Sequence, residues 1–398
     1  MPGLHKKGYD VSTTVDLAAI ETPVVLLDRS KLQHNLADMQ ALADRHQVAL
    51  RPHAKTHKSV EIARRQIALG AVGLTVATVD EALVFLDNGI GSITISRPLV
   101  AATSFDRLFA SRAVAEADLR IVVDSASGVR IAAEKAAGAN KRLGVLIKID
   151  VGLHRCGVDP TGSVALDLAR EILVTSHLDF CGILSHAGQV YASESRQAAV
   201  DIAEVERTTM LSVRDSMFAS GLAVTEVSVG ATPTVLAATS FEGITEIRPG
   251  NYAFLDLLPI KVGVVDYSRV SLSVLATVIS KNADFFITDA GSKTLTSDTG
   301  GHGMASAQGF GLAYPCARFL DPEYGLVVAG LSEEHGKLIR AGFDMEIGDK
   351  VRIIPNHSCP VANLARAYIV SDGERCETWP VDAASNVGPG GADCGDLV

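Results

Sequence analysis

The sequence predicts a (β/α)8 barrel followed by a second, mainly β domain. Eight short apolar runs rich in β-branched residues alternate with helical patterns between about residues 24 and 262. The pattern then changes to strand-like segments separated by Gly, Pro and Asp turns. A chain of 398 residues also exceeds the usual size of one hydrophobic core. We therefore expect a barrel over 24–262, a β domain over 263–385 to which 1–23 could contribute, and a flexible tail over 386–398.

The runs predicted as barrel strands are almost continuously apolar, which is typical of parallel strands that are buried on both faces. In order they are VALRPHA (48–54), GLTVAT (73–78), SITISR (92–97), LRIVVD (119–124), LGVLIKID (143–150), LDFCGILSH (178–186), VTEVSV (224–229) and ITEIRPG (244–250). A doubly wound sheet shows the same local pattern, so the barrel prediction depends mainly on the count of eight runs. In such barrels the chemistry takes place at the carboxyl ends of the strands.

The segments between the runs show the helical period. In SKLQHNLADMQALADRH the apolar residues recur on one face of a helix, and these are Leu32, Leu36, Met39 and Leu42. Ser30 and Gln33 could form a capping box at the start of this helix.

The second domain is predicted from strand-like segments that follow Asp256. These are GVVDYSRVSLSVLATVISKN, FFITDAG, YGLVVAG and DKVRIIPNH, with few long helical patterns between them. The Gly-rich stretch GGHGMASAQGFG (300–311) follows no convincing strand–helix junction. We therefore interpret it as a mobile loop rather than as a dinucleotide-binding fingerprint.

Composition narrows the class of partner. The formal net charge of −10 argues against nucleic acid or an anionic membrane as a partner, because binding phosphates requires a basic surface. The six cysteines form no CxxC pair, and no signal peptide is recognisable. No apolar run reaches the length of about 18 residues that would suggest a membrane span. We expect a cytoplasmic protein with reduced thiols that acts on a small molecule.

Basic residues gather in LRPHAKTHKS, at the end of the first predicted strand. A lysine at position 55 that is desolvated and close to Arg51 or Lys58 would have a lowered pKa and become nucleophilic. Schiff-base formation with an aldehyde cofactor requires such an amine. From spacing alone, a surface lysine after a strand is the alternative.

Two turns of small residues follow the seventh and eighth predicted strands, SVGATPT (228–234) and RPGNYAF (248–254). Phosphate sites in barrels are often built from the loops at these two places. Backbone N–H groups could converge there on a phosphate; the residues concerned are Gly230, Ala231, Thr232, Gly250, Asn251 and Tyr252. Two ordinary turns are the alternative.

A candidate metal site lies in PNHSCPVAN, where His357 and Cys359 are two positions apart. Side chains at i and i+2 of an extended backbone share a face, so both can bind one ion. A thiolate–imidazole pair prefers zinc to the harder magnesium, manganese or calcium ions. Two protein ligands leave positions open for water and substrate, as in catalytic sites. A core cysteine beside a hydrogen-bonded histidine is the alternative.

Further polar residues are predicted at strand ends. Arg155 follows the fifth strand, where it could face the ring nitrogen if the aldehyde cofactor contains a pyridine ring. A structural ion pair is the alternative role for Arg155. His186 follows the sixth strand and, with Tyr191, could hold substrate; satisfied core positions are the alternative. His335 of the second domain is also placed near the site.

The motifs RPHAKTHK, HRCGV, SHAGQVY, RPGNYAFLD, DAGSK, EEHG and NHSC occur in this order between Arg51 and Cys359. With these motifs, over roughly residues 20 to 385, the chain resembles the D-threonine aldolase and D-serine dehydratase family. The members are fold-type III pyridoxal 5′-phosphate (PLP) enzymes with an alanine-racemase-like barrel and a β domain, and they usually act as dimers.

The resemblance implies roles for named residues. The lysine of the PHxK motif, which carries PLP in the family, corresponds to Lys55, and the metal pair corresponds to His357 and Cys359. We count His57 and His186 with Lys55 as candidate catalytic residues. The candidate cofactor-binding residues are His53, Arg155, Tyr191 and the two turns after the seventh and eighth strands.

The family divides at the metal pair. Aldolase-like members typically carry His-x-Asp and a harder ion, whereas dehydratases carry His-x-Cys and zinc; this chain has Cys359 and a dehydratase-like GATPT loop. The resemblance therefore implies a PLP- and zinc-dependent lyase, although another divalent ion could serve. It would remove water from a D-3-hydroxy amino acid of the D-serine, D-threonine or D-threo-3-hydroxyaspartate type, giving a 2-oxo acid and ammonia. A D-threonine or 3-hydroxy-D-aspartate aldolase, or a non-catalytic PLP-binding protein, is the alternative.

Overall fold

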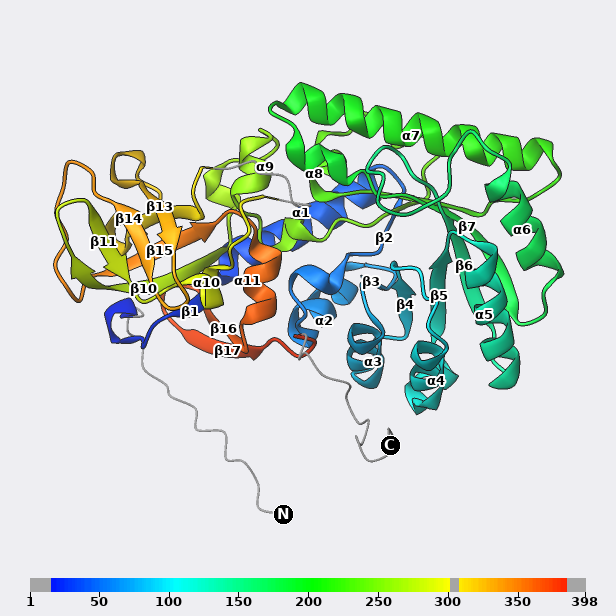
Figure 1. The fold of residues 1–398 in the computed structure, drawn as a ribbon, viewed down its shortest axis with the longest axis horizontal. Helices are drawn as coiled ribbons and strands as arrows, with labels where there is room; N and C mark the ends of the chain where they lie inside the picture. The colour runs from blue at the N-terminus through cyan, green and yellow to red at the C-terminus, as the bar shows by residue number, and fades with distance from the viewer. Residues whose placement is uncertain (1–15, 301–307, 385–398) are drawn as a thin grey trace, which may run out of the picture.

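The computed structural model describes residues 16–300 and 308–384, which form a parallel barrel and a mainly antiparallel β domain (Figure 1). The tail predicted over 386–398 and most of the Gly-rich stretch lie outside the described residues.

All eight predicted barrel strands form, and all are parallel. Their order in the sheet is β2 (Ala49–Leu50), β9 (Glu246–Ile247), β8 (Glu226–Val229), β7 (Leu178–Leu184), β6 (Leu143–Lys148), β5 (Asp118–Val123), β4 (Ser92–Ile95) and β3 (Leu74–Val76). A parallel bridge between His53 and Thr75 joins the two ends of this order. The prediction of a barrel is confirmed.

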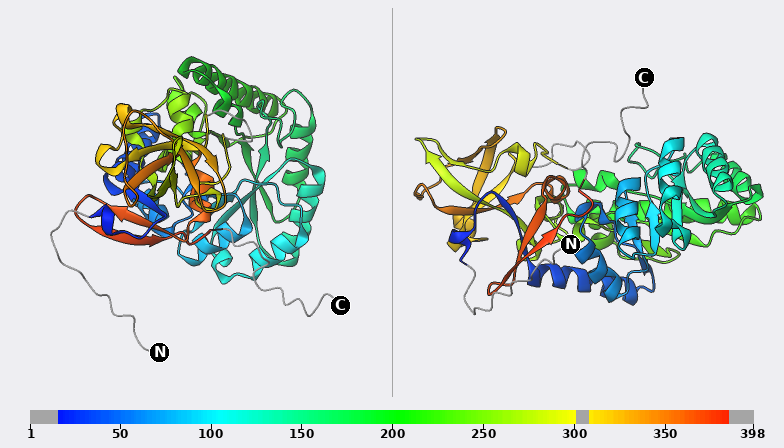
Figure 2. Two further views of the ribbon diagram at one scale, coloured as in Figure 1. Left: turned by 60° about the vertical axis from the view of Figure 1, so that its left-hand side comes forward. Right: turned by 90° about the horizontal axis from the view of Figure 1, so that it is seen from below.

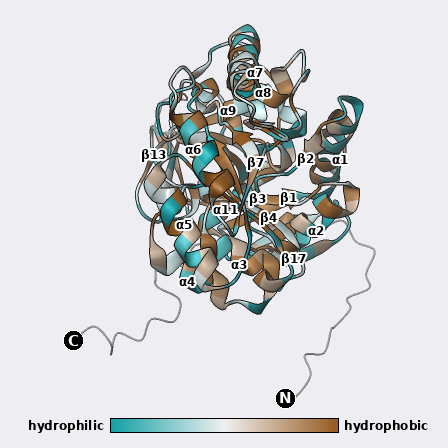
Figure 3. Cartoon of the chain, turned by 90° about the vertical axis from the view of Figure 1, so that its right-hand side faces the viewer, coloured by the Kyte–Doolittle hydropathy of each residue, from teal (hydrophilic) through white to brown (hydrophobic). Residues whose placement is uncertain are grey.

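Helices surround the barrel strands, as two further views show (Figure 2). They are α1 (Arg29–Arg45), α2 (Val60–Leu69), α3 (Val79–Asp87), α4 (Ala102–Ala110), α5 (Ala126–Gly138), α6 (Val164–Val174), α7 (Arg196–Ala219) and α8 (Thr232–Ala237), with the short α9 (Leu257–Lys261) leading out of the barrel. Their apolar faces pack on the strands and their polar faces point outward (Figure 3). Within the described residues, no helix combines the length and apolar character needed to cross a bilayer.

The first helix begins one residue before the predicted capping residue. Asp28 is its N-cap, and its carboxylate accepts the Lys31 N–H at 3.0 Å. The capping box predicted at Ser30 is therefore wrong, because Asp28, the last residue of a strand, already supplies the acceptor. The predicted apolar face is confirmed, since Leu32, Leu36 and Met39 are buried and the half-buried Leu42 packs against the same core.

The second domain is built on one sheet of nine strands. Their order is β11 (Phe285–Thr288), β14 (Gly336–Ile339), β13 (Leu326–Leu331), β12 (Gly311–Pro315), β15 (Lys350–Pro355), β10 (Leu272–Lys281), β1 (Val24–Asp28), β16 (Ala367–Ser371) and β17 (Cys376–Pro380). β10 also pairs with β11, so part of the sheet curls onto itself. Two short helices, α10 (Ser292–Leu295) and α11 (Ser358–Leu364), belong to this part of the chain.

The first strand of the chain departs from the domain boundary expected at residue 24. Val24–Asp28 pairs antiparallel with β10 and parallel with β16, so it belongs to the β domain, and the barrel part begins with α1. A short buried apolar strand has the same sequence pattern in either sheet, which is why its pattern could not assign it. Just before it, the Ile20 carbonyl accepts a hydrogen bond from the Lys350 amine at 3.0 Å.

Candidate active site

A cavity of about 190 Å³ lies between the carboxyl ends of the barrel strands and the start of α11. All the site residues predicted from motifs, except His57, Tyr252 and His335, line this cavity together with Thr56 and Arg248. The lining residues are His53, Lys55, Thr56, Arg155, His186, Tyr191, Gly230, Ala231, Thr232, Arg248, Gly250, Asn251, His357 and Cys359. Hollows of about 240 to 340 Å³ occur elsewhere in the described chain, but those combine no buried lysine with a thiol.

Lys55 lies in a turn of 3₁₀-helix, Ala54–Thr56, directly after β2. Burial lowers the pKa of the Lys55 amine; the Cys359 thiolate opposes this shift, and the Arg155 guanidinium reinforces it. A lowered pKa raises the neutral, nucleophilic fraction of the amine near neutral pH. The surroundings of Lys55 therefore suit attack on an aldehyde.

His53 is fixed through both of its ring nitrogens. Its Nδ1 accepts the Lys55 backbone N–H at 3.4 Å, and its Nε2 lies 3.1 Å from Ser96 Oγ. Because Ser96 Oγ donates to the Val76 carbonyl, the proton between His53 and Ser96 belongs to Nε2. Burial and the charge of Lys55 lower the pKa of His53 well below its usual value. His53 is therefore a neutral ring that lines the cavity with both of its nitrogens already hydrogen-bonded.

The two turns predicted to hold a phosphate meet in the cavity, but most of their N–H groups already have acceptors. Three of these bonds are from Gly230 to Glu206 Oε1 (3.4 Å), from Ala231 to Thr234 Oγ1 (3.0 Å) and from Tyr252 to Thr232 Oγ1 (3.1 Å). The Thr232 N–H interacts with the Tyr191 hydroxyl. Of the six candidate residues in these turns, Gly250 and Asn251 are the two whose N–H groups have no acceptor among the described residues.

Gly250 allows the second turn to lie against the lysine segment. A Cβ at Gly250 would lie 2.7 Å from the His53 carbonyl oxygen and 2.8 Å from Thr56 Oγ1, so no larger residue fits. The buried Oδ1 of Asn251 also has no hydrogen-bond partner within the described residues. The unused N–H donors of Gly250 and Asn251 are what a site for an anionic group requires, whereas the Asn251 Oδ1 is an acceptor and does not contribute to one.

Arg155, His186 and Tyr191 all reach the cavity from the loops after β6 and β7. The His186 Nδ1–H donates to the Gly230 carbonyl at 3.1 Å, which fixes the ring next to the first turn. Burial raises the pKa of the Tyr191 hydroxyl well above 10, so it stays protonated at neutral pH.

His357 and Cys359 meet at the junction between β15 and α11. His357 is the N-cap of α11 in an extended conformation, and Cys359 lies in the first turn of the helix. The expectation of an extended backbone through both residues is therefore wrong, because the helix begins at Ser358. The two side chains nevertheless line the same cavity and lie close enough to influence each other's charge, because both project from the start of the helix.

The electrostatics of this pair suit a metal ion. Burial alone would lower the pKa of His357, but the Cys359 thiolate and the hydrogen bond with Asp298 raise it to about 10. Burial alone would raise the pKa of Cys359, and His357 outweighs this and lowers it. His357 Nδ1 lies 2.9 Å from Asp298 Oδ2, the carboxylate–histidine arrangement common behind metal ligands. No cluster of three or more metal-binding groups occurs among the described residues, so this pair would leave coordination positions open.

A buried carboxylate ties α11 to the barrel. Asp256 Oδ2 accepts the Ser358 N–H and the Asn251 side-chain amide, each at 2.7 Å. Across the cavity, Cys359 Sγ lies 3.3 Å from Thr56 Oγ1. These contacts hold the thiol of Cys359 next to the segment that carries Lys55.

Three residues proposed from the sequence lie outside the cavity. His57 is buried against Phe85 and lies 3.2 Å from Gln66 Oε1, and burial lowers its pKa to about 4. The Tyr252 hydroxyl accepts from Gln66 Nε2 at 2.9 Å. His335 is exposed in the turn between β13 and β14. We therefore give none of these side chains a chemical role.

Sequence reasoning missed Arg248, Thr56 and Asp298. Arg248 and Thr56 lie within the quoted motifs, and their positions at strand ends were a usable signal. Asp298 lies far from His357 in the sequence, and no spacing connects the two.

Comparison with known proteins identifies the family. The family described as alanine racemase, N-terminal domain, matches residues 27–257, and a putative serine dehydratase domain matches residues 271–371. The chain belongs to this alanine racemase-like family. The resemblance inferred from the motifs is therefore confirmed.

Members of this family similar to the chain have named activities. D-threo-3-hydroxyaspartate dehydratase of Delftia sp. strain HT23 is 35% identical over 375 residues, covering 91% of this chain and 97% of the relative. D-threonine aldolase of Arthrobacter sp. is 33% identical, with 92% and 93% covered. A solved structure of the Delftia dehydratase has a TM-score of 0.83 at 34% identity, covering 92% of this chain and 98% of that one. The family is PLP-dependent, and the chain is a lyase.

Proposed function

We propose that this lyase uses PLP and a divalent metal ion to remove water from a D-configured 3-hydroxy amino acid, giving a 2-oxo acid and ammonia. One observation carries the proposal: a half-buried lysine of lowered pKa and a His–Cys pair line the same cavity. The likeness to D-hydroxy amino acid dehydratases supports it.

Lys55 is the residue that would hold the cofactor and move the proton. Bound PLP supplies a ring that stabilises negative charge at the substrate's Cα. The buried Lys55 amine, with its lowered pKa, is suited to take up the Cα proton. The N–H groups of Gly250 and Asn251 would hold the phosphate, and the neutral His53 would pack on the ring.

His357 and Cys359 would hold the metal ion, which we propose to be zinc. A thiolate–imidazole pair favours zinc, and an ion there supplies a Lewis acid for the departing hydroxyl. A D-threo-3-hydroxyaspartate dehydratase similar to this chain has been solved as a cysteine-to-alanine variant in its metal-free form and as a histidine-to-alanine variant. The two substituted positions of that enzyme have the same order and spacing as His357 and Cys359.

The aldolase is the competing function, because an aldolase relative is nearly as similar as the dehydratase. Cys359 favours dehydration, since a soft thiolate ligand favours zinc over the harder ions. Incubation with D-threonine distinguishes the two reactions: dehydration gives 2-oxobutanoate and ammonia, whereas retro-aldol cleavage gives glycine and acetaldehyde. Glycine and acetaldehyde as sole products would overturn the dehydratase proposal, and absence of turnover with PLP bound would favour a non-catalytic binding protein.

A homodimer and a cytoplasmic location complete the proposal. The family resemblance implies the dimer, and the cysteine pattern supports the location. Sedimentation equilibrium of the purified protein tests the first, and fractionation of the source cells tests the second.

A further inference from the structure

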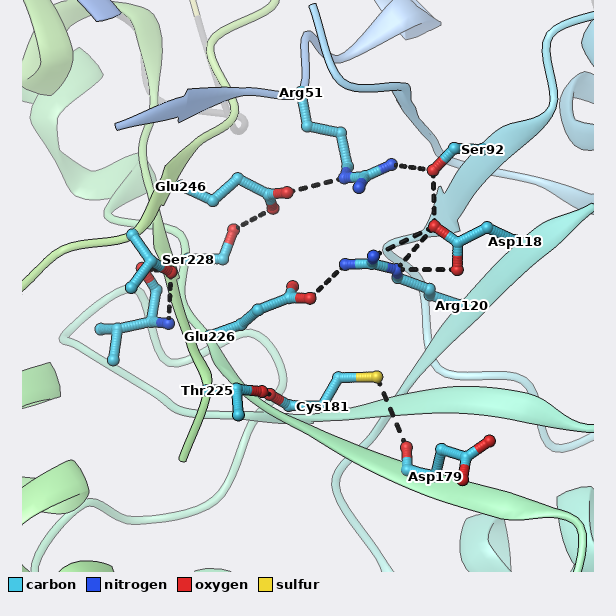
Figure 4. A network of polar contacts seen from close by, with 12 residues as sticks. Arg51, Ser92, Asp118, Arg120, Asp179, Cys181, Thr225, Glu226, Ser228 and Glu246 are labelled. Carbon is cyan, nitrogen blue, oxygen red and sulfur yellow. Dashed lines mark hydrogen bonds and ion pairs between the residues drawn. The ribbon is translucent and has the colours of Figure 1, made fainter. Parts of the chain in front are cut away.

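The barrel interior carries charged side chains at the amino ends of its strands, on the side opposite the cavity (Figure 4). Ser92, Asp118, Glu226 and Glu246 are the first residues of β4, β5, β8 and β9. Barrels of this type usually fill their interior with layers of branched apolar residues. Charged groups placed there need partners, because burying an unpaired charge is costly.

Arg51 links one side of this interior to the other. Its Nε–H donates to Glu246 Oε2 at 2.7 Å, and its Nη1–H donates to Ser92 Oγ at 2.7 Å. Ser92 Oγ in turn donates to Asp118 Oδ2 at 2.7 Å. The Arg51–Glu246 ion pair is almost fully buried, with 3% and 5% of the side chains exposed.

A second ion pair crosses the barrel. Arg120 of β5 pairs with both Asp118 and Glu226. Since β6 and β7 separate β5 from β8 in the sheet, the Arg120–Glu226 pair spans the interior. Glycines make room for the two arginines, because a Cβ at Gly73 would lie 2.3 Å from the Arg51 guanidinium and one at Gly144 would lie 3.0 Å from Arg120.

One branch of this network reaches the cavity. Ser228 Oγ donates to Glu246 Oε1 at 2.6 Å and accepts the Arg248 Nε–H at 2.8 Å. The second side-chain hydrogen bond of Arg248 goes to the Ser185 carbonyl. Arg248 lines the cavity beside Lys55.

Arg248 forms no direct ion pair within the described residues, which is unusual for an arginine that is only 4% exposed. A carboxylate bound directly to the guanidinium would neutralise its charge. A serine hydroxyl between the two fixes the orientation of the arginine and leaves its charge facing the cavity.

We propose that Ser228 and Glu246 are positioning residues, which hold Arg248 in place so that its charge acts on the cofactor and on Lys55. The inference rests on the proposed function, because it assigns the network to the PLP cavity. Glu226 provides a matched control: it is also the first residue of a barrel strand and pairs with an arginine, but it makes no hydrogen bond to Ser228 or Arg248.

The test measures PLP affinity, the melting temperature of the PLP-free protein and the pH dependence of the bound PLP absorbance. Ser228→Ala and Glu246→Gln should each weaken PLP binding about tenfold, the effect of one lost charge-assisted hydrogen bond. Glu226→Gln should lower the melting temperature but change the PLP dissociation constant by less than about twofold. Circular dichroism shows whether each variant is folded.

The pH dependence separates positioning from a merely structural role. Loss of the Glu246 charge leaves more positive charge near Lys55. The midpoint, which is the pH at which the bound PLP absorbance has changed by half, should therefore move to lower pH in Glu246→Gln. It should stay in place in Glu226→Gln. If all three variants lower the melting temperature while PLP affinity and the midpoint stay at wild-type values, the network is only structural and the inference is wrong. A wild-type protein that binds no PLP would instead overturn the proposed function.

Discussion

The amine of Lys55 is buried among cations, and its chemistry follows from that setting. Desolvation penalises its charged form, and Arg155 and Arg248 add to the penalty, while Cys359 and Glu81 oppose it. Three residues later, Lys58 is also buried but forms an ion pair with Glu81 at 3.2 Å. The two lysines of this segment therefore differ in whether a carboxylate binds them directly.

The first prediction concerns covalent attachment of the cofactor. Borohydride reduction followed by peptide mass analysis should find PLP on Lys55 in the wild-type protein and on no lysine in Lys55→Ala. Lys58→Gln should keep the label on Lys55 while lowering the melting temperature, because the substitution leaves Glu81 buried without its ion pair. A label on Lys58 would remove Lys55 from the proposed role.

The second prediction concerns pH and His57. The unfolded chain binds a proton at this histidine near pH 6.5, whereas the folded protein does so only near pH 4. Stability should therefore fall as the pH drops between these values, by about 3 kcal/mol from His57 alone. Urea unfolding should show a flatter pH dependence in His57→Gln, with the cofactor still bound.

A loss of turnover in His57→Gln, without loss of stability, would restore the catalytic role that its position in the motif suggested.

At the scale of elements, the start of α11 determines where the metal pair lies. Asp256 binds the Ser358 N–H and the Asn251 amide, so one carboxylate fixes both the helix and the turn proposed to hold the phosphate. The Asp256 carboxylate that makes these bonds is buried, and burial raises its pKa.

The third prediction follows from this contact. Asp256→Asn should weaken zinc binding about 10- to 100-fold, as loss of groups that orient metal ligands does. Competition with a chromogenic chelator measures the affinity. Asp266→Asn is the control, because Asp266 caps the 3₁₀ turn Tyr267–Arg269 and its carboxylate accepts from Ser268 rather than from α11. Equal affinities in the two variants would contradict the role given to Asp256.

The fourth prediction concerns removal of the metal. Chelation should abolish turnover while PLP stays bound, because His357 and Cys359 are distinct from the groups proposed to hold PLP. Zinc should restore the rate, and metal analysis should find the ion missing from Cys359→Ala. Full activity in a chelated protein free of metal would show that the pair serves another purpose.

At the scale of the whole molecule, the lysine segment is held by both domains. From the β domain, the Tyr368 hydroxyl donates to the His57 carbonyl at 2.6 Å, Asp382 accepts the Val60 N–H at 2.7 Å, and the Ala383 N–H donates to the Lys58 carbonyl at 2.9 Å. Gln66 of α2 holds His57 from the barrel side. The position of Lys55 therefore depends on the packing of both domains.

The fifth prediction tests this interdomain support. Asp382→Ala should speed hydrogen exchange in the segment from His53 to Val60 and slow the capture of PLP, because it leaves the Val60 N–H without its acceptor. Asp372→Ala, which removes a turn acceptor on the surface of the same sheet, should change neither. Unchanged exchange in both variants would mean that the barrel alone holds the segment.

Local pattern predicted much of this structure. Barrel strands buried on both faces are apolar throughout, so their number and order could be read from the sequence, and the turns after β8 and β9 follow from that order. Contacts between distant segments could not be read. The pairing of β1 with β10, the approach of Asp298 to His357 and the orientation of His57 away from the cavity all depend on tertiary packing.

The position of β1 in the sheet has a consequence for the order in which the chain can fold during synthesis. Val25 lies beside Val274 and Tyr368, so the earliest described strand finds its two neighbours only after the whole barrel has been synthesised. During translation this apolar strand cannot form its native pairs until most of the polypeptide has been synthesised. The sheet of the second domain can therefore be completed only after the barrel has been translated. Cys359 takes its place beside Lys55 at that late stage.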